Sequence, residues 1–186
     1  MPARPRRHQA SPLAVARGDF FLTILYAVCV VGGLSAQTAS DFTSRSTRDR
    51  IQAVLASYEP ARAIHWYRTD STEFYGIFDQ RLRYAERFEV RITITPQNTV
   101  WMRVYPEWGG HRINLDRVRD PNGLARTLLR LSYHNFFFWG TTDDSDLFAG
   151  FQFTLESGFP EESFKEVIKS IPLIDDSVGE INNFTD

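Results

Sequence analysis

The hydrophobic pattern is clearest in two segments near the middle of the chain. In Phe88–Thr95, apolar residues at every second position alternate with charged or hydroxyl side chains. Val100, Met102 and Val104 continue this alternation after a turn at residues 96–98. A period of two puts one set of side chains on a buried face and the other on a wet face. The pattern predicts an antiparallel pair of strands that packs on helices.

The stretch Asp120–Ile171 has the pattern of a helix, a hairpin and a second helix. Asp120 and Pro121 are suited to the start of a helix, because aspartate accepts first-turn N–H groups and proline has none to leave unpaired. The helix is predicted to end near Asn135. Its buried stripe is predicted to hold leucines at four- and three-residue spacing, widened by two further residues. These residues are Leu124, Leu128 and Leu131, with Ala125 and Leu129 at the margin.

An aromatic run at residues 136–139 predicts the first strand of the hairpin, and residues 140–146 predict its turn. Residues 147–155 predict the second strand, with odd-numbered side chains such as Ala149 and Phe151 on one face. The even-numbered side chains, Phe148 among them, are predicted on the opposite face. The last helix is predicted from Pro160, and Pro172 is expected to stop or kink it.

The earlier part of the domain is predicted to begin with a helix over residues 47–59, capped by Ser46 or Thr47. Two short strands are expected at residues 64–68 and 74–78, the second broken at its glycine. Together these elements predict an α+β fold, an antiparallel sheet packed against helices, in the rough order α-β-β-β-β-α-β-β-α.

The N-terminal residues have a pattern of their own. Residues 1–19 are basic, and Phe20–Gly33 is an uncharged, mostly apolar run with the length of a signal-peptide core. This predicts a signal peptide at residues 1–36, a polar linker at 37–46 and the folded domain at 47–186. Export to the periplasm or the medium is the expected localisation.

An uncleaved signal anchor is the alternative for the N-terminal run. Residues 20–34 would then hold the domain at the membrane, the one way in which a membrane is expected to be involved. A helix that spans a bilayer needs about 20 apolar residues, which is more than this run offers. Cys29, the only cysteine, lies within it, so no disulfide can form inside the chain.

Composition and charge narrow the class of partner. The formal net charge is −2, and removal of the basic N-terminal segment would leave the remaining chain more acidic. Nucleic acid is therefore not expected as a partner, since proteins that bind it carry basic patches. The high phenylalanine content is compatible with an ordinary globular core.

At this point the chain resembles a known family. The segment Leu124–Asn135 (LARTLLRLSYHN), the aromatic strand, the acidic turn, the second strand and the helix from Pro160 look like the YbjN-like domain. Members of that family are also described as bacterial sensory transduction regulators, and their fold is similar to that of type III secretion chaperones. The resemblance spans roughly residues 47–181. It implies a small sheet-and-helix domain that binds other proteins or a second copy of itself, with no established reaction.

No motif for catalysis, a cofactor or a metal is found. The four histidines have no metal-ligand spacing, and no phosphate loop, dinucleotide fingerprint or nucleophile elbow occurs. Asp143, Asp144 and Asp146 form the one acidic cluster, but its spacing is not that of a calcium loop. We interpret the cluster as a solvated hairpin turn, and Asp175 and Asp176 as surface charges.

The aromatic residues of the second central strand are the best candidates for a binding surface. Trp101, Arg103 and Tyr105 would share the face opposite the valines, and Trp108 follows them. These side chains form either a second buried layer or an exposed patch. The leading hypothesis is an exported, non-enzymatic module that binds protein, with a regulatory or chaperone-like role. The alternative is a small cell-envelope protein that binds or cleaves cell-wall sugars by stacking them on these aromatic rings.

Overall fold

A computed structural model describes residues 44–67, 70 and 72–185. Within them, seven strands form one sheet in the order β1-β2-β3-β4-β7-β6, with β5 paired to β4, and every pairing is antiparallel. The strands are β1 (His65–Tyr67), β2 (Glu73–Phe78), β3 (Arg87–Ile94), β4 (Thr99–Trp108), β5 (His111–Arg112), β6 (Phe138–Thr141) and β7 (Leu147–Thr154). The predicted signal peptide, with Cys29, and residues 37–43 of the predicted linker lie outside the described residues.

The helices complete an α+β fold, which confirms the predicted class. Residues 44–57 are helical, and four α-helices and 3₁₀ turns follow among the described residues. They are α2 (Glu59–Arg62), η1 (Leu115–Arg117), α3 (Pro121–His134), α4 (Glu161–Ser170), η2 (Ile171–Leu173) and α5 (Ile174–Ile181). The predicted order lacked α2, β5 and the division of the last helix into α4 and α5.

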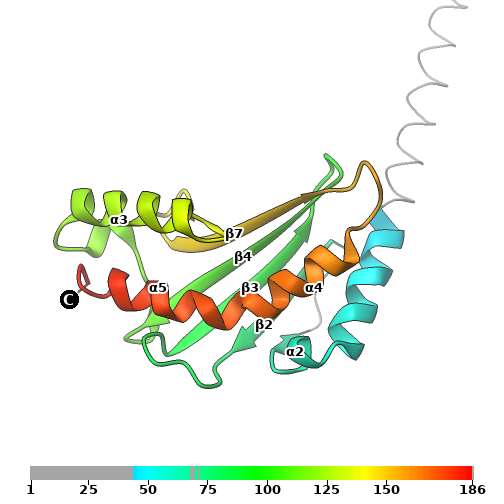
Figure 1. Cartoon of the computed structure of the whole chain (residues 1–186), viewed down its shortest axis with the longest axis horizontal. Helices are drawn as coiled ribbons and strands as arrows, with labels where there is room; N and C mark the ends of the chain where they lie inside the picture. The colour runs from blue at the N-terminus through cyan, green and yellow to red at the C-terminus, as the bar shows by residue number, and fades with distance from the viewer. Residues whose placement is uncertain (1–43, 68–69, 71, 186) are drawn as a thin grey trace, which may run out of the picture. The chain divides into compact units, whose positions relative to one another are not determined.

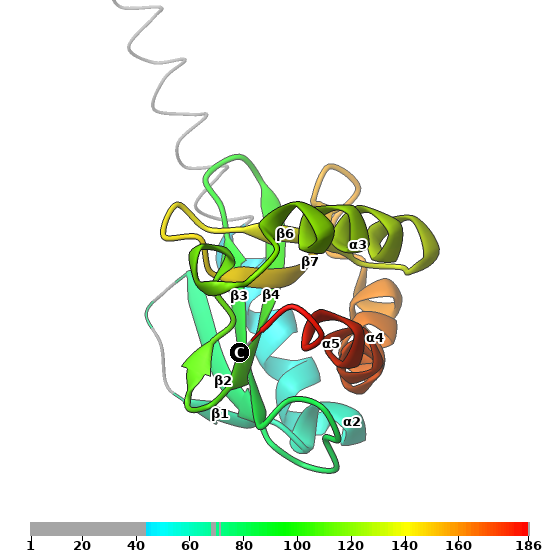
Figure 2. The same cartoon turned by 90° about the vertical axis from the view of Figure 1, so that its left-hand side faces the viewer.

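The helices of the described part gather on one face of the sheet (Figure 1), and the view turned by 90° shows the opposite face without a helix (Figure 2). Alternate residues of the strands point beneath the helices, where they form the hydrophobic core. Its fully buried side chains include Phe88 and Ile92 from β3, Met102 from β4, and Phe164 and Ile168 from α4. We call these two sides the covered face and the open face.

The start of the domain differs from the prediction in two ways. Residues 44–46 were assigned to a polar linker but are already helical, so Ser46 and Thr47 cannot cap the helix. Thr47 is buried. The prediction was wrong because the serines and threonines that suggested a linker occupy the first turns of an amphipathic helix.

Strand β2 runs through Gly76 without the predicted break. Gly76 pairs with Trp66 of β1 and with Val90 of β3. A Cβ atom at position 76 would lie 2.7 Å from the Trp66 ring and from the side chain of Ile64. The glycine therefore lets an aromatic ring lie across the strand, which is a common use of glycine in sheets.

Helix α3 begins as predicted, because the side chain of Asp120 accepts a hydrogen bond from the N–H of Gly123 at 2.9 Å. Leu124, Leu128 and Leu131 are buried as predicted. Leu129 is not, since 73% of it is exposed. The prediction that Leu129 widens the buried stripe was therefore wrong. Tyr133, in the last turn of α3, and Phe136, just beyond the helix, are exposed as well.

The last helix is interrupted at η2, which contains Pro172, in line with the prediction that this proline stops or kinks it. Asp175, predicted as a surface charge, is buried at 6% exposure. Its carboxylate accepts hydrogen bonds from the backbone N–H groups of Arg83, Tyr84 and Ala85. The sequence pattern missed this contact because it joins segments about 90 residues apart. Asp176 is exposed, as predicted.

Candidate functional site

Strand β4 divides its side chains between the two faces of the sheet. Val100, Met102 and Val104 lie in the core, whereas Trp101 and Arg103 are partly buried on the open face. The register places Arg103 between Arg91 of β3 and Gly150 of β7. Side chains of the neighbouring strands with the same alternation therefore join the β4 residues on the open face.

Aromatic rings from five strands form a layer on the open face. The Trp101 and Phe138 rings are 6.4 Å apart between centroids, Phe138 and Phe148 are 6.1 Å apart, and Phe148 and Tyr105 are 5.8 Å apart. At the other edge of the sheet, the Tyr67 and Tyr75 rings are 5.4 Å apart. We call these rings the aromatic platform: Tyr67, Tyr75, Trp101, Tyr105, Phe138 and Phe148.

Gly150 leaves room for one of these rings to approach the backbone of the sheet. It pairs directly with Phe138, and a Cβ atom at position 150 would lie 2.5 Å from the Phe138 ring. Any other residue at this position would push the ring away from the strand. The platform is therefore held close to the backbone by the sequence of β7, and its rings are fixed by one another and by the strands.

Three arginines lie over the platform. The guanidinium carbon of Arg103 is 4.9 Å from the centre of the Trp101 ring and 5.1 Å from that of Phe148. Arg112 lies 4.4 Å above Tyr105, and Arg91 lies 5.9 Å from both Tyr75 and Tyr105. These distances fall within the range of cation–π attraction. Aromatic and arginine side chains together are the composition typical of the centres of protein interfaces.

Two buried carboxylates pair with arginines on this face. Glu89 lies 2.5 Å from Arg91 Nε and 2.6 Å from Arg112 Nη2. Glu107 lies 2.6 Å from Arg87 Nε. Both glutamates are almost completely buried, while the arginines are partly or largely exposed. The pairs join β3, β4 and β5, and Arg87, Glu107 and Arg112 lie at the end of the sheet near the β4–β5 hairpin.

These pairs perturb several ionisable groups. Burial lowers the pKa of Arg112, but its hydrogen bonds and charge interactions with Glu89 and Asp146 outweigh burial and leave the pKa raised. The hydrogen bond to Glu107 raises the pKa of Arg87. Burial raises the pKa of Tyr75, and the negative charges of Glu89 and Glu107 raise it further. Both arginines therefore remain cationic, and Tyr75 remains neutral, well above neutral pH.

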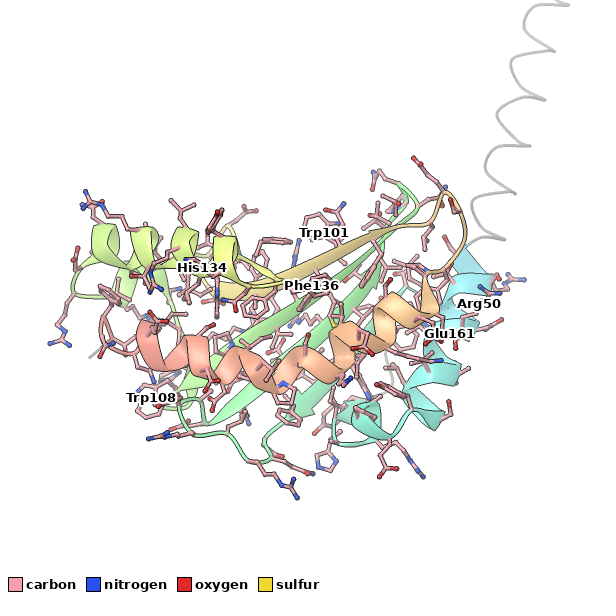
Figure 3. The ribbon with its side chains drawn as sticks, viewed as in Figure 1. Arg50, Trp101, Trp108, His134, Phe136 and Glu161 are labelled. Atoms are coloured by element: carbon pink, nitrogen blue, oxygen red, sulfur yellow. The ribbon has the colours of Figure 1, made fainter. Side chains whose placement is uncertain are left out.

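The four candidate residues from the sequence do not form one surface. Trp101, Arg103 and Tyr105 share the open face, but Tyr105 is only 3% exposed beneath Arg112 and beside Phe148. Trp108 is 44% exposed at the far end of β4 from Trp101, as Figure 3 shows. Grouping Trp108 with the other three was wrong, because its place in the alternation of β4 differs from theirs and it pairs with His111 of β5 at the end of the strand.

Several residues of the platform were missed from the sequence. Phe148 was predicted to face away from Ala149, which the structure confirms. Its burial between β6 and β4 side chains was not foreseen, and Phe138 was treated as ordinary strand composition. Arg91 and Glu89 were read as the wet face of β3. The pairing of β4 with β3 on one side and with β7 on the other brings these groups together, and alternation within one strand carries no signal for such pairing.

The acidic turn is partly tied into the structure. Asp146 lies 3.1 Å from Arg112 and accepts a hydrogen bond from Asn114 Nδ2 at 2.9 Å. Asp143 and Asp144 are exposed. In residues 44–67, 70 and 72–185, no group of three or more histidine, cysteine, aspartate or glutamate residues is arranged to hold a metal ion.

Two grooves lie near the β4–β5 hairpin. One of about 320 Å³ is lined by charged residues that include Arg87, Glu107 and Asp146. The other, of about 250 Å³, contains Trp108 beside His111. The residues that line either groove do not include Trp101, Arg103 or Tyr105. A larger groove of about 590 Å³ lies elsewhere, between α2 and the end of α4.

Comparison of the chain with known proteins identifies no similar protein. No protein-family model matches the chain, and no curated protein or solved structure matches it significantly. The resemblance to the YbjN-like domain therefore stays a prediction. Among the residues that the structure describes, no helix is both long and apolar enough to cross a membrane.

Proposed function

We propose that the domain is a non-enzymatic module that binds another protein through the open face of its sheet. The observation that carries this proposal is the aromatic platform with its three arginines, on the face of the sheet that the helices leave uncovered (Figure 2). A regulatory or chaperone-like role would follow from such binding, as the predicted family resemblance also implies.

The platform has the features of a preorganised binding surface. Its rings contact one another across the strands, so few side-chain rotations would have to be frozen when a partner binds. Trp101 and Phe138 supply apolar area that is still partly accessible. Rigid aromatic side chains beside arginines account for a large share of binding energy in protein interfaces.

Sugar stacking has less support from the same residues. A stacked sugar needs a free ring face. The Arg103 guanidinium lies over the Trp101 ring, 4.9 Å from its centre. The Phe138 ring is nearly perpendicular to the Trp101 ring, with 6.4 Å between the two ring centroids. Tyr105 is buried and offers no ring face. A protein partner could bind the side chains in their present arrangement. A sugar could stack on the Trp101 ring only after Arg103 had moved away from it.

A peptide display selection tests the proposal. The protein, as purified from its producing cells, would be immobilised and offered a library of random linear peptides. We expect peptides to be enriched on the wild-type protein and on Leu129→Ala, which changes an exposed apolar residue of α3 outside the platform. We expect the same peptides to be lost on Trp101→Ala and Phe138→Ala. Equal binding to all four proteins, or no enrichment at all, would contradict the proposal.

We also propose that the protein is exported, from the pattern of residues 1–36. The measurement is the intact mass of the protein recovered from the periplasm or the medium. A mass that lacks about the first 36 residues is the expected result. A full-length mass in the membrane fraction would instead favour the signal-anchored alternative through residues 20–34.

A further inference from the structure

Arg103 differs from the other arginines of the open face in its partners. Arg87, Arg91 and Arg112 each lie within hydrogen-bonding distance of a glutamate. No carboxylate of the described residues forms an ion pair with Arg103, and its Nε atom is buried without a hydrogen-bond acceptor. A buried donor without an acceptor is unfavourable, and more so when its group is charged.

The residues that pair with Arg103 in the sheet make its charge less favourable still. In the sheet register it lies directly opposite Arg91, and like charges opposite each other on paired strands are destabilising. On its other side is Gly150, which has no side chain to offer as a partner. Neither strand neighbour offers a carboxylate, so no ion pair across the strands balances the charge of Arg103.

The aromatic rings hold the Arg103 guanidinium in place without using its donors. Trp101 and Phe148 approach it at 4.9 and 5.1 Å from their ring centres. Contact with ring faces does not use the in-plane N–H groups. Nε is buried, but Arg103 as a whole is partly exposed, so its terminal N–H groups are the ones that an outside oxygen acceptor would reach. An arginine held in this way is suited to accept a carboxylate, because its planar fork matches two oxygens.

We propose that Arg103 is the receptor for one carboxylate of the protein partner, an aspartate or glutamate flanked by an apolar residue. This proposal rests on the proposed function and names the chemistry of its partner. The carboxylate would pair with Arg103, and the flanking apolar side chain would pack against the parts of Trp101 and Phe138 that remain accessible beside Arg103. A single negative charge fits, because one cation of the platform lacks a partner while Glu89 and Asp146 already pair with Arg91 and Arg112.

The same peptide selection tests this step with three Arg103 variants. On the wild-type protein, the enriched peptides should contain aspartate or glutamate next to an apolar or aromatic residue. Arg103→Gln should lose the acidic preference, and Arg103→Lys should keep it in weakened form. Arg103→Glu should reverse it toward lysine and arginine. Arg126→Gln, which neutralises an exposed arginine of α3, is the matched control and should select as the wild type does.

Single peptides then give the magnitude. Replacing the selected glutamate with glutamine should weaken binding to the wild-type protein by about tenfold or more, because a charge-assisted hydrogen bond is lost. The same replacement should have little effect on binding to Arg103→Gln. A phosphoserine peptide is included as a further arm, and tighter binding of that peptide than of the glutamate peptide would overturn the assignment to a carboxylate.

The folded state of the variants is checked by thermal denaturation. Arg103→Gln should melt close to the wild-type temperature, because removal of the charge opposite Arg91 offsets the loss of the contacts with Trp101 and Phe148. The failures of the two proposals are distinguishable. Trp101-dependent binding without an acidic preference, or an acidic preference that survives in Arg103→Gln, would overturn the role of Arg103 alone. Absence of any Trp101-dependent binding would overturn both proposals.

Discussion

The two faces of the sheet are made from the same strands but differ in composition and in what covers them. On the covered face, residues such as Val90, Ile92 and Met102 are apolar and lie beneath α4 and its neighbours. On the open face, the intervening residues of the same strands include Glu89, Arg91 and Arg103 among aromatic rings. The covered face supplies the buried apolar area that stabilises the fold. The open face carries charges that a stable core does not require.

The free-energy cost of burying charged groups on the open face is the most informative difference between the two faces. Burying a paired charge gives little or no net stability relative to an apolar residue of the same size. Glu89 and Glu107 are nevertheless buried among arginines, and Arg103 lies there with no carboxylate partner in the described residues. Such an arrangement is understandable if the open face exists for binding.

The largest expected difference between the faces is between two adjacent residues of β4. Met102→Ala should lower the free energy of unfolding by about 2–5 kcal/mol, because it leaves a cavity in the core. Trp101→Ala should lower it by about 1–2 kcal/mol, since it removes one ring contact and one cation–π contact at a partly open surface. Urea denaturation of both variants measures the difference. Equal losses would show that the open face supports the fold as much as the core does.

The next effect concerns the paired charges. Glu89→Gln keeps the shape of the side chain but removes the charge that joins Arg91 and Arg112. We expect a loss of about 1–3 kcal/mol in the free energy of unfolding. Glu156→Gln, at an exposed position just beyond β7, is the control and should change stability by less than about 0.5 kcal/mol. If Glu89→Gln were as neutral as its control, the ion pairs would be surface contacts of no consequence.

How much of this comparison was predictable depends on the range of the contacts. Alternation in β3 and β4 predicted the covered face, and Asp120 predicted the start of α3, because both signals are local. The burial of Phe148 depends on β7 lying beside β4. The burial of Asp175 depends on a distant loop. Neither follows from spacing within one segment.

The candidate site shows the same limit. The sequence identified Trp101, Arg103 and Tyr105 as one face, since they alternate on one strand. It could not show that Tyr105 would be covered by Arg112, nor that Phe138 would reach Trp101 from β6. Trp108 was grouped with them by proximity in sequence alone. The unpaired state of Arg103 became visible only when the neighbours on both sides were known.

The smallest expected effect is a dependence on pH at the open face. Burial and the charges of Glu89 and Glu107 raise the pKa of Tyr75 above its unfolded value of about 10. The neutral phenol is favoured in the folded state, so its contribution is fully present below about pH 10 and is lost as the pH rises through the folded pKa.

Stability curves against alkaline pH for the wild type and Tyr75→Phe measure this contribution. The wild type should lose more stability than Tyr75→Phe above about pH 10, because only the wild type has a phenol to ionise at this position. Superimposable curves would mean that Tyr75 is solvated like an ordinary surface tyrosine, and that the charges of the open face do not reach it.

The most direct test of the central claim is to locate a bound peptide on the two faces. A peptide from the display selection would be titrated into isotope-labelled protein while backbone amide and arginine Nε–H signals are followed by NMR. We predict that the largest shifts occur at the Arg103 Nε–H and at the amides of β4, β6 and β7. Shifts confined to the exposed end of α3, around Leu129 and Tyr133, or to the groove beside α2, would contradict the account.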